Sequence, residues 1–228
     1  KTKQNAYIIH HDIINTNEHG IPHNRERWYC VGFRKEIAFE FPVGSQKGST
    51  LREVVDDKHY NEELLLPDDE LNRIDFHFKH HEITPRVQHP NSHCNPESKK
   101  GKYGIFSYLK PDNTLRFHTG DPAKSQIQDD YYVSLDSVAP TLIATRAPKM
   151  WDLRRHLSVL ECQKLQGFPD SYDFSDVSIK VAKKQLGNAV TVSVVKKIAE
   201  TMIYYYLKDS KIPKIYLQFE EAEQLSLI

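Results

Sequence analysis

Arg25 and Arg27 lie two positions apart in a segment that we expect to be extended. Because alternate side chains of a strand point to the same face, both guanidinium groups should project to one side. A pair of this kind can hold a phosphate or donate hydrogen bonds to a carbonyl oxygen. The alternative is an ordinary solvated strand edge, which the spacing alone favours.

Asn188 follows Gly187 at a break between two expected helices, residues 178–185 and residues 190–207. Both residue types tolerate positive φ, so the pair is typical of a helix C-cap. A tight cap also exposes backbone groups to a ligand. The segment can therefore serve as a cap and as a ligand contact at once.

The cysteines Cys30, Cys94 and Cys162 are widely spaced and odd in number. This usage predicts a reducing, cytosolic protein without a disulfide framework. Cys162 falls in an expected helix, where a buried structural thiol is the better interpretation. Histidines gather before and around Cys94: His77, His80, His81, His89 and His93. Their spacings match no standard zinc finger and a second cysteine is missing, so we predict no metal site.

The composition suits one large domain or two small ones, because 39% of the 228 residues are hydrophobic and 27% are charged. The 31 Lys and Arg residues balance 31 Asp and Glu residues, so net charge gives no argument for a nucleic-acid partner. No apolar run is long enough to span a bilayer, and no signal peptide is evident. Because the sequence begins with Lys1 rather than Met, we expect a fragment or a processed product.

The first half of the chain is predicted to contain mostly strands. Residues 7–14 and 28–33 read as strands, the second of them buried. Thr50 and Glu53 fit a capping box that opens a short helix to about residue 57. Residues 75–136 read as a loop-rich, mostly β module. Its expected strands, and the strand that follows it, are residues 103–109, 114–118, 131–135 and 138–145.

The last third is predicted to be helical. Ser158 and Glu161 form a second capping box, and the helix that it opens should stop at Gly167. The helix over residues 190–207 has an apolar stripe at Val194, Ile198, Met202 and Tyr205 or Tyr206. Residues 215–219 read as a further strand.

Three segments carry distinctive patterns. They read GIPHNRERWYCVGFR from Gly20, RHLSVLECQKLQGFPD from Arg155 and KQLGNAV from Lys184. In this order they resemble signature blocks of the DNA cytosine-5 methyltransferase family. The chain departs from the family pattern at His23, where Gln is usual, and at Leu160, where Arg is usual.

The resemblance implies an α/β fold: a partial Rossmann-like methyltransferase catalytic domain plus a small, mostly β target recognition domain. Residues 1–48 would be C-terminal strands of the catalytic domain, and residues 49–150 the target recognition domain. Residues 151–228 would return to the catalytic domain as its closing helices. Leu157, Leu165 and Phe168 would then be core contacts.

The resemblance also implies a reaction. A cysteine thiolate adds to C6 of a flipped cytosine, and C5 then attacks the methyl group of S-adenosylmethionine. Arg27 would reach the carbonyl oxygen of the base, and Arg25 would contact the catalytic loop or a phosphate. Asn188 and Ala189 would contact the amino-acid end of the cofactor.

Double-stranded DNA is the partner that the resemblance implies. Base-reading contacts should come from loops of residues 49–150, although the sequence does not select them. The residues that we predict to touch DNA are Lys99, Lys100, Lys102, Arg116, Thr141, Leu142, Arg146 and Arg155.

The front of the family pattern is absent from this sequence. No cysteine follows a proline, and neither a Glu-Asn-Val nor a glycine-rich cofactor loop occurs. We therefore expect the C-terminal half of an enzyme, inactive alone, whose nucleophile lies on a second chain or on a missing N-terminal half. The strands over residues 7–33 and the helix over residues 190–207 should then expose apolar faces. The natural setting of the family is bacterial restriction-modification in the cytoplasm.

Two other interpretations remain open. In the first, the chain is a non-enzymatic, sequence-specific DNA-binding module or an inactive remnant. In the second, it is an RNA-directed relative of the family. A partner chain that carries the Pro-Cys segment would distinguish the enzyme from the module, and a tRNA binding assay would test the last.

Overall fold

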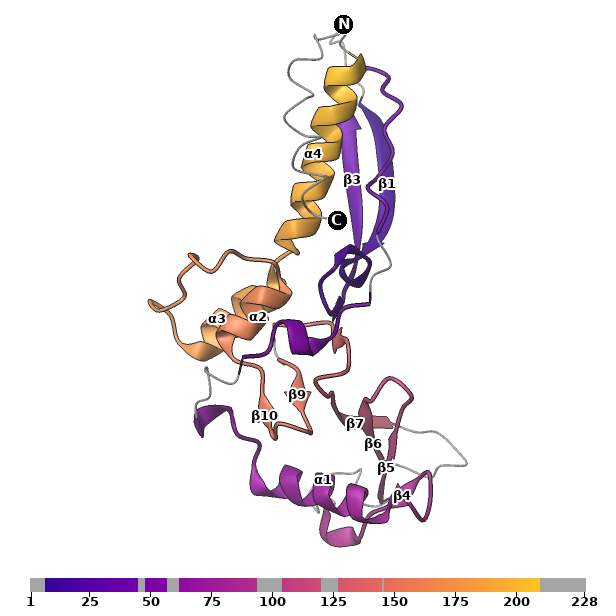
Figure 1. Ribbon diagram of the computed structural model, residues 1–228, viewed down its shortest axis with the longest axis vertical. Coiled ribbons are helices and arrows are strands. Elements are labelled where there is room, and N and C mark those ends of the chain that lie inside the picture. Colours follow the sequence, from indigo (N-terminus) through magenta and orange to yellow (C-terminus); the bar gives the residue numbers. More distant parts are fainter. Residues whose placement is uncertain are drawn as a thin grey trace, which may run out of the picture.

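A computed structural model describes residues 7–44, 48–56, 62–93, 104–119, 127–144 and 146–209. The molecule is elongated, and its cores follow one another along the long axis (Figure 1). A hairpin with helix α4 lies at one end, helices α2 and α3 lie in the middle, and helix α1 with a small sheet lies at the other end. The expected strand at residues 215–219 falls outside the described residues.

The hairpin pairs β1 (Ile8–Asn15) with β3 (Glu26–Phe33) in antiparallel register, from Ile8 opposite Phe33 to Asn15 opposite Glu26. The connection contains a 3-10 turn (Thr16–His19) that ends at Gly20, whose φ of 84° favours glycine. One face of the hairpin packs against α4 (Val192–Asp209). The buried residues of this core are Ile14, Val31, Phe33, Ile37, Phe39, Val194 and Ile198.

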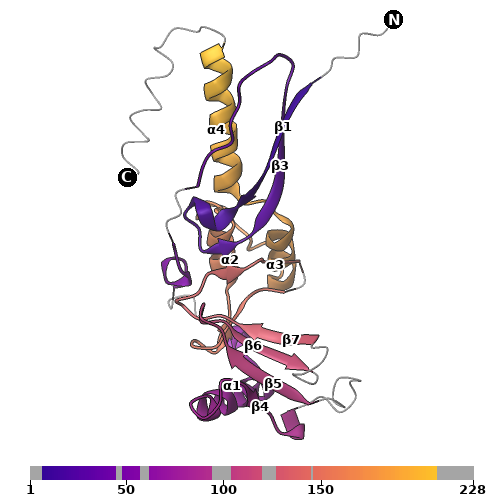
Figure 2. The same cartoon turned by 90° about the vertical axis from the view of Figure 1, so that its right-hand side faces the viewer.

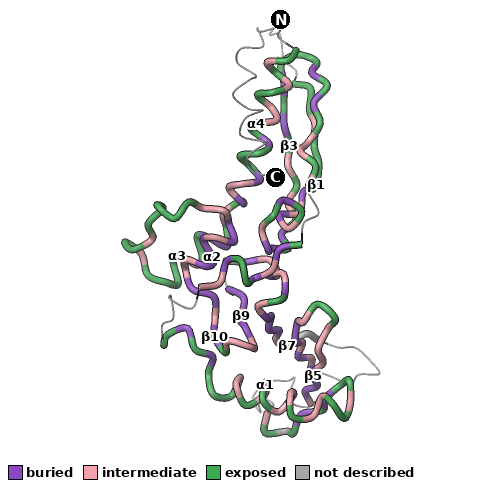
Figure 3. The backbone as a smooth tube through the Cα atoms, in the orientation of Figure 1, coloured by how far each residue is buried: buried purple, intermediate pink, exposed green. Residues whose placement is uncertain are grey.

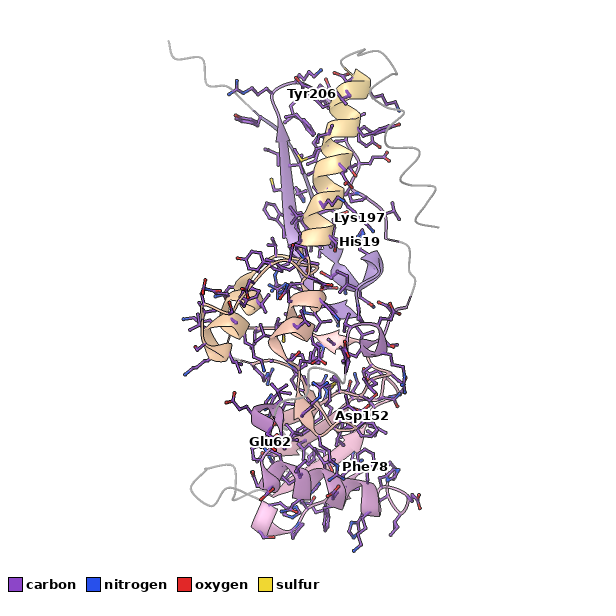
Figure 4. The ribbon with its side chains drawn as sticks, turned by 60° about the vertical axis from the view of Figure 1, so that its left-hand side comes forward. His19, Glu62, Phe78, Asp152, Lys197 and Tyr206 are labelled. Atoms are coloured by element: carbon purple, nitrogen blue, oxygen red, sulfur yellow. The ribbon has the colours of Figure 1, made fainter. Side chains whose placement is uncertain are left out.

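The apolar stripe predicted for the last helix is confirmed. Val194 and Ile198 are buried, and Met202 and Tyr205 pack against the same core. The Tyr205 ring lies 5.7 Å from that of Phe39, so Tyr205 rather than Tyr206 continues the stripe. At the base of α4, Lys197 lies near His19 (Figure 4), and burial followed by this charge lowers the pKa of His19.

The prediction that residues 28–33 form a buried strand is wrong for half of its positions. Val31 and Phe33 are buried, but Trp28 is 61% exposed and Cys30 is exposed. The described residues cover one face of the hairpin, so its side chains alternate between core and surface. Much of the hairpin is accordingly exposed or intermediate in Figure 3.

The middle layer contains α2 (Val159–Leu165) and α3 (Ile179–Asn188). The paired strands β9 (Lys149–Met150) and β10 (Arg155–His156) lie next to them, and β2 (His23–Asn24) runs parallel to β8 (Ala139–Pro140). Of the described residues in the expected strand over residues 138–145, Ala139 and Pro140 form a strand. The core of this layer includes Leu51, Val133, Leu142, Met150, Leu157, Cys162, Leu165 and Leu186.

One of the two predicted capping boxes is confirmed. The Ser158 hydroxyl accepts from the Glu161 N–H at 3.1 Å, and the Glu161 carboxylate accepts from the Ser158 N–H at 2.7 Å. The box predicted at Thr50 is wrong, because its side chain makes no capping bond to the 3-10 turn Leu51–Glu53. The first N–H groups of this turn donate instead to the carbonyls of Ser137 and Leu135, so a distant turn replaces the cap.

The last layer is an antiparallel four-stranded sheet in the order β4-β5-β6-β7, with α1 (Asp68–His80) against one face (Figure 2). The strands are Val87–Gln88, Ile105–Leu109, Leu115–Thr119 and Ile127–Tyr132. Two 3-10 turns, Glu62–Leu64 and Asn91–His93, flank α1 and β4. The core is formed by Leu66, Ile74, Ile105, Leu115, Phe117 and Tyr132.

Helix α1 is the element that the sequence analysis missed, because residues 75–136 read as mostly β. Its signal was present. Pro67 precedes an acidic first turn, which suits a helix N-terminus. Leu71, Ile74 and Phe78 then recur at helical spacing and pack on the sheet. Histidines in the last turn obscured this pattern.

Among the residues described, the helices are too short or too polar to cross a bilayer.

Candidate functional site

The Arg25 side chain is buried, and only 2% of the residue is exposed. Its Nη1 donates to the Leu142 carbonyl at 2.7 Å, and its Nη2 donates to the carbonyls of Gly187 at 3.2 Å and Ala189 at 2.5 Å. One guanidinium therefore joins the segment after β8 to the end of α3. We call Arg25, Leu142, Gly187 and Ala189 the Arg25 joint. Burial, then the charge of Arg27, lowers the pKa of Arg25 to about 10.

Gly187 permits this joint because a side chain would not fit there. A Cβ built on Gly187 would lie 2.3 Å from the Ile143 carbonyl carbon and 2.4 Å from the Ala144 nitrogen. The last turn of α3 thus packs backbone to backbone against residues 143–144. A glycine is required here for close approach and not for an unusual φ.

The predicted C-cap at Gly187-Asn188 is wrong, because both residues belong to α3 and the helix ends on Ala189 in an extended conformation. The Ala189 N–H still bonds back to the carbonyls of Gln185 and Leu186. Asn188 is exposed and Ala189 is half-buried. Both remain accessible to a ligand at the joint, which is where a cofactor contact was predicted.

His23 occupies the position where the family pattern has glutamine, and it is fully buried. The Leu142 N–H donates to its Nε2 at 3.0 Å, so Nδ1 carries the proton and donates to the Leu165 carbonyl at 3.0 Å. A glutamine side chain offers the same donor and acceptor. Burial, then the charge of Arg25, lowers the pKa of His23 to about 4, which keeps the ring neutral.

Arg27 lies in β3, two residues after Arg25, and is only half-buried. Its Nη1 donates to the carbonyl of Glu26 at 2.6 Å. Within the described ranges no carboxylate lies within ion-pair distance of Arg27. The guanidinium therefore keeps donors for a ligand beside the joint.

Two of the predicted DNA contacts are placed in the interior. Arg155 is 2% exposed and makes a two-pronged ion pair with Glu161 at 2.9 and 2.8 Å. Burial opposes ionisation of Glu161, but the bonds from Arg155 and Ser158 prevail and lower its pKa. Leu142 has no exposed surface, and the joint and His23 use its backbone groups. This placement leaves neither residue accessible to DNA.

The other predicted DNA contacts lie nearer the surface. Thr141 is half-buried, and its hydroxyl donates to the Asn24 carbonyl at 2.7 Å. Arg146 is exposed, and Arg116 is half-buried; their guanidinium carbons lie 4.5 and 5.0 Å from the centre of the same Tyr131 ring. The predicted contacts Lys99, Lys100 and Lys102 fall outside the described residues.

Two buried histidines in the layer formed by α1 and the four-stranded sheet are linked through the hydroxyl of Ser107. The Ser107 hydroxyl lies 2.7 Å from His77 Nδ1 and 2.7 Å from His89 Nε2. Burial, then a neighbouring histidine, lowers the pKa of His77 to about 4 and that of His89 to about 3. The described residues contain no group of three or more potential metal ligands, and Cys94 is outside them.

Cys162 is fully buried, as predicted, and burial raises the pKa of its thiol to about 12. A second buried contact escaped the sequence analysis. The Gln166 side chain bonds to the Leu186 carbonyl and to the Thr191 hydroxyl, tying α2 to the start of α4. Its signal was the Leu-Gln-Gly-Phe-Pro segment, which the resemblance assigned to scaffold as a whole.

The family model for C-5 cytosine-specific DNA methylase matches residues 1–204. The chain belongs to this family, which confirms the resemblance and the α/β methyltransferase fold.

Particular relatives agree. Type II methyltransferase M.HaeII of Haemophilus aegyptius is 27% identical over 228 residues, with 100% of this chain and 59% of the relative covered. Type II methyltransferase M.FnuDI of Fusobacterium nucleatum is 24% identical, with 86% and 56% covered. The S. pombe Dnmt2 methyltransferase structure matches with a TM-score of 0.53, 15% identity and coverage of 92% and 59%. This chain thus spans somewhat more than half the length of these proteins.

Proposed function

We propose that this chain is the C-terminal portion of a DNA (cytosine-5-)-methyltransferase. It supplies recognition of double-stranded DNA and part of the pockets for the base and the cofactor. Methyl transfer from S-adenosylmethionine to C5 of cytosine then requires an N-terminal half, on a second chain or elsewhere in the same protein. We retain the division into residues 1–48, 49–150 and 151–228, and the bacterial cytoplasm as the setting.

One observation carries this proposal: the Arg25 joint binds two segments with different expected tasks. Leu142 lies near the end of the expected target recognition domain, residues 49–150, and Ala189 is one of the two expected cofactor contacts. Arg27, two residues further along the chain in β3, has donors available for a ligand. The three expected functions thus share one small region of the molecule.

The roles of individual residues follow from their exposure. Arg27 donates to the carbonyl oxygen of an extruded cytosine, whereas buried Arg25 positions the surrounding segments. Asn188 offers an exposed carboxamide with a donor and an acceptor, which suits the charged ends of an amino acid. Asn188 and Ala189 would therefore bind and orient the amino-acid end of S-adenosylmethionine, which supplies the methyl group.

The open face of the hairpin supports a missing half. Ile9 is 53% exposed, Ile13 is 64% exposed and Trp28 is 61% exposed, and these residues lie on the face turned away from α4. On α4 itself, Ile203 is 53% exposed and Tyr206 is 50% exposed. Exposed apolar surface of this kind marks an interface. The occupant that we propose is the remainder of the catalytic sheet.

The cysteines also favour a nucleophile from elsewhere. Cys162 is buried with a raised pKa, the opposite of what a nucleophilic thiolate needs. Cys30 is exposed on the open face of the hairpin, and in the whole sequence neither it nor Cys94 follows a proline.

The test compares the purified chain alone with the chain plus a polypeptide that carries Pro-Cys and glycine-rich segments. Transfer of a labelled methyl group to duplex DNA should occur only in the mixture, and bisulfite mapping should place it on cytosine. A Cys30→Ser variant should behave like the wild type in the mixture. Methyl transfer by the chain alone would refute the need for a second half.

A non-enzymatic DNA-binding module is the second candidate. The separate core between α1 and the four-stranded sheet favours it, because that layer has its own buried residues. DNA binding that persists while no partner restores methyl transfer would support this candidate instead.

A further inference from the structure

We propose that the face of the four-stranded sheet turned away from α1 binds the phosphate backbone of duplex DNA, with Arg86, Arg116 and Arg146 as its contacts. We call these three arginines with Tyr108, His118 and Tyr131 the arginine face. The inference rests on the proposed function and extends it, because it assigns the DNA contact to one side of the sheet.

Strand register separates the two sides. Arg116 lies opposite Tyr108 on one neighbouring strand and opposite Tyr131 on the other, so these three side chains share a face. The residues that alternate with them, including Leu115 and Tyr132, belong to the core under α1. Figure 2 shows α1 along one side of the sheet only.

Guanidinium groups on this face stack on aromatic rings. The guanidinium carbon of Arg86 lies 5.7 Å from the Phe106 ring centre and 5.8 Å from that of Tyr108. Arg116 and Arg146 share the Tyr131 ring at 5.0 and 4.5 Å. Stacking restrains these long side chains before a ligand arrives, so less entropy is lost on binding. The donors at the edges of the Arg86 and Arg146 guanidinium planes remain suited to phosphate oxygens.

The arginine face is positively charged. His118 lies between Tyr108 and Phe106, and burial, then the charges of Arg116 and Arg86, lower its pKa. Carboxylates would raise that pKa. In the described part of the chain neither Arg86 nor Arg146 forms an ion pair with a carboxylate. A row of several cations requires a partner with repeated negative charges.

Acidic residues gather on the other side. The first turns of α1 carry Asp68, Asp69 and Glu70, and Asp75 follows. Nearby cations pair with three of these carboxylates: Lys149 with Glu70, Arg154 with Asp75 and Arg73 with Asp69. A polyanion would therefore meet paired charges beside α1, but on the arginine face it would meet Arg86 and Arg146, which have no carboxylate partner among the described residues.

The arginine face is continuous with the proposed base site. Arg146 closes a short turn with Ile143, whose N–H and carbonyl pair with those of Arg146 at 3.3 and 3.1 Å. Leu142, the residue before this turn, belongs to the Arg25 joint. A duplex lying on the arginine face would therefore pass the joint, where a cytosine has to be extruded.

The experiment measures binding of a fluorescently labelled duplex of about 20 base pairs to the 228-residue chain over a series of salt concentrations. Separate Arg86→Gln, Arg116→Gln and Arg146→Gln variants remove one charge each. Each should weaken binding about eightfold at 0.1 M salt and reduce the slope of log K against log salt by about 1. The loss should be similar for unrelated duplex sequences, because phosphate contacts carry no sequence information.

Two matched controls remove a positive charge from the other side. Lys79 is exposed on α1, and Arg154 is exposed and paired with Asp75. Lys79→Gln and Arg154→Gln should leave affinity and salt slope unchanged. Circular dichroism and thermal melting of every variant establish that the fold is retained.

Each result distinguishes the inference from the proposed function. Wild-type binding with unchanged salt slopes in all three arginine variants would overturn the arginine face and leave DNA recognition standing. Equal losses in the α1 controls would also overturn it, since the effect would then follow net charge. Failure of the wild-type chain to bind DNA would overturn both, and tighter binding of an RNA hairpin would make the partner RNA.

Discussion

The carbonyl oxygen of Leu142 lies 2.7 Å from Nη1 of Arg25, although 117 residues separate the two along the chain. The same guanidinium also holds the end of α3. A residue from the first hairpin thus ties the segment after β8 to the end of α3. Arg25 is buried in these contacts, whereas Arg27 is half-buried and is the residue that we propose to donate to the base.

Replacing Arg25 should cost stability. Arg25→Ala leaves three carbonyl groups without their charged donor, and we expect a loss of about 3 kcal/mol in the free energy of unfolding. Arg25→Lys keeps the charge but not the fork of donors, so it should recover only part of this loss. Chemical denaturation measures both. Arg25→Ala as stable as the wild type would contradict the joint.

Arg27→Ala should have the opposite profile. The side chain is half-buried and bonds only to the carbonyl of Glu26 among described partners, so stability should change by less than about 0.5 kcal/mol. Methyl transfer in the mixture with the N-terminal half should fall at least about 100-fold, because a donor to the base is lost. Arg34→Ala, an exposed change farther along the chain, is the control and should affect neither quantity.

Gly187→Ala should destabilise the middle layer. The added methyl group would meet the backbone of residues 143–144 at 2.3 Å, and backbone cannot move aside as a flexible side chain can. We expect a loss of about 2 kcal/mol and weaker joining of α3 to the target recognition segment. Gly48→Ala is the matched control, because nothing lies within 4 Å of its Cβ position. Equal melting temperatures for the two variants would count against the close packing.

His23 should make stability dependent on pH. Its pKa is about 4 in the folded chain and 6.5 in the unfolded chain, so the folded state binds the proton more weakly. The contribution of neutral His23 to the free energy of unfolding is therefore complete above about pH 6.5. It declines by about 3 kcal/mol in total as the pH falls toward 4.

His23→Gln provides the control for this pH effect. It retains one donor and one acceptor but does not titrate in this range. His77 and His89 also have lowered pKa values, so the comparison is the difference between wild type and variant at each pH. A difference that stays constant from pH 7 to pH 4 would exclude His23 as a contributor.

The features that the sequence predicted correctly depend on local or family patterns. The stripe of α4 depends on helical spacing, and the Ser158 box requires only residues three apart. The capping box predicted at Thr50 does not form, although its residue types are equally favourable. The carbonyls of Leu135 and Ser137 accept from the first N–H groups of the turn instead. Those acceptors lie more than eighty residues away in the chain, beyond the reach of a local pattern.

The site illustrates the same limit. Arg155 and Arg25 looked like ligands for phosphate because sequence reasoning recognises charge but not burial. Burial becomes visible only when Glu161 and the carbonyls around Arg25 are placed in space. The ring of Tyr131, which holds Arg116 and Arg146, was missed for a similar reason: stacking partners are defined across strands and turns.

The two tryptophans report on different parts of this molecule. The Trp151 ring lies 4.6 Å from the Phe78 ring, in the layer formed by α1 and the four-stranded sheet. Its indole N–H donates to the Asn113 carbonyl. Trp28 stands in solvent on the open side of the hairpin. Its fluorescence therefore reports the docking of the proposed N-terminal half on this face. On mixing of the two polypeptides the emission should shift to shorter wavelength, and Trp28→Phe should abolish the shift, so assembly can be followed in real time without an added dye.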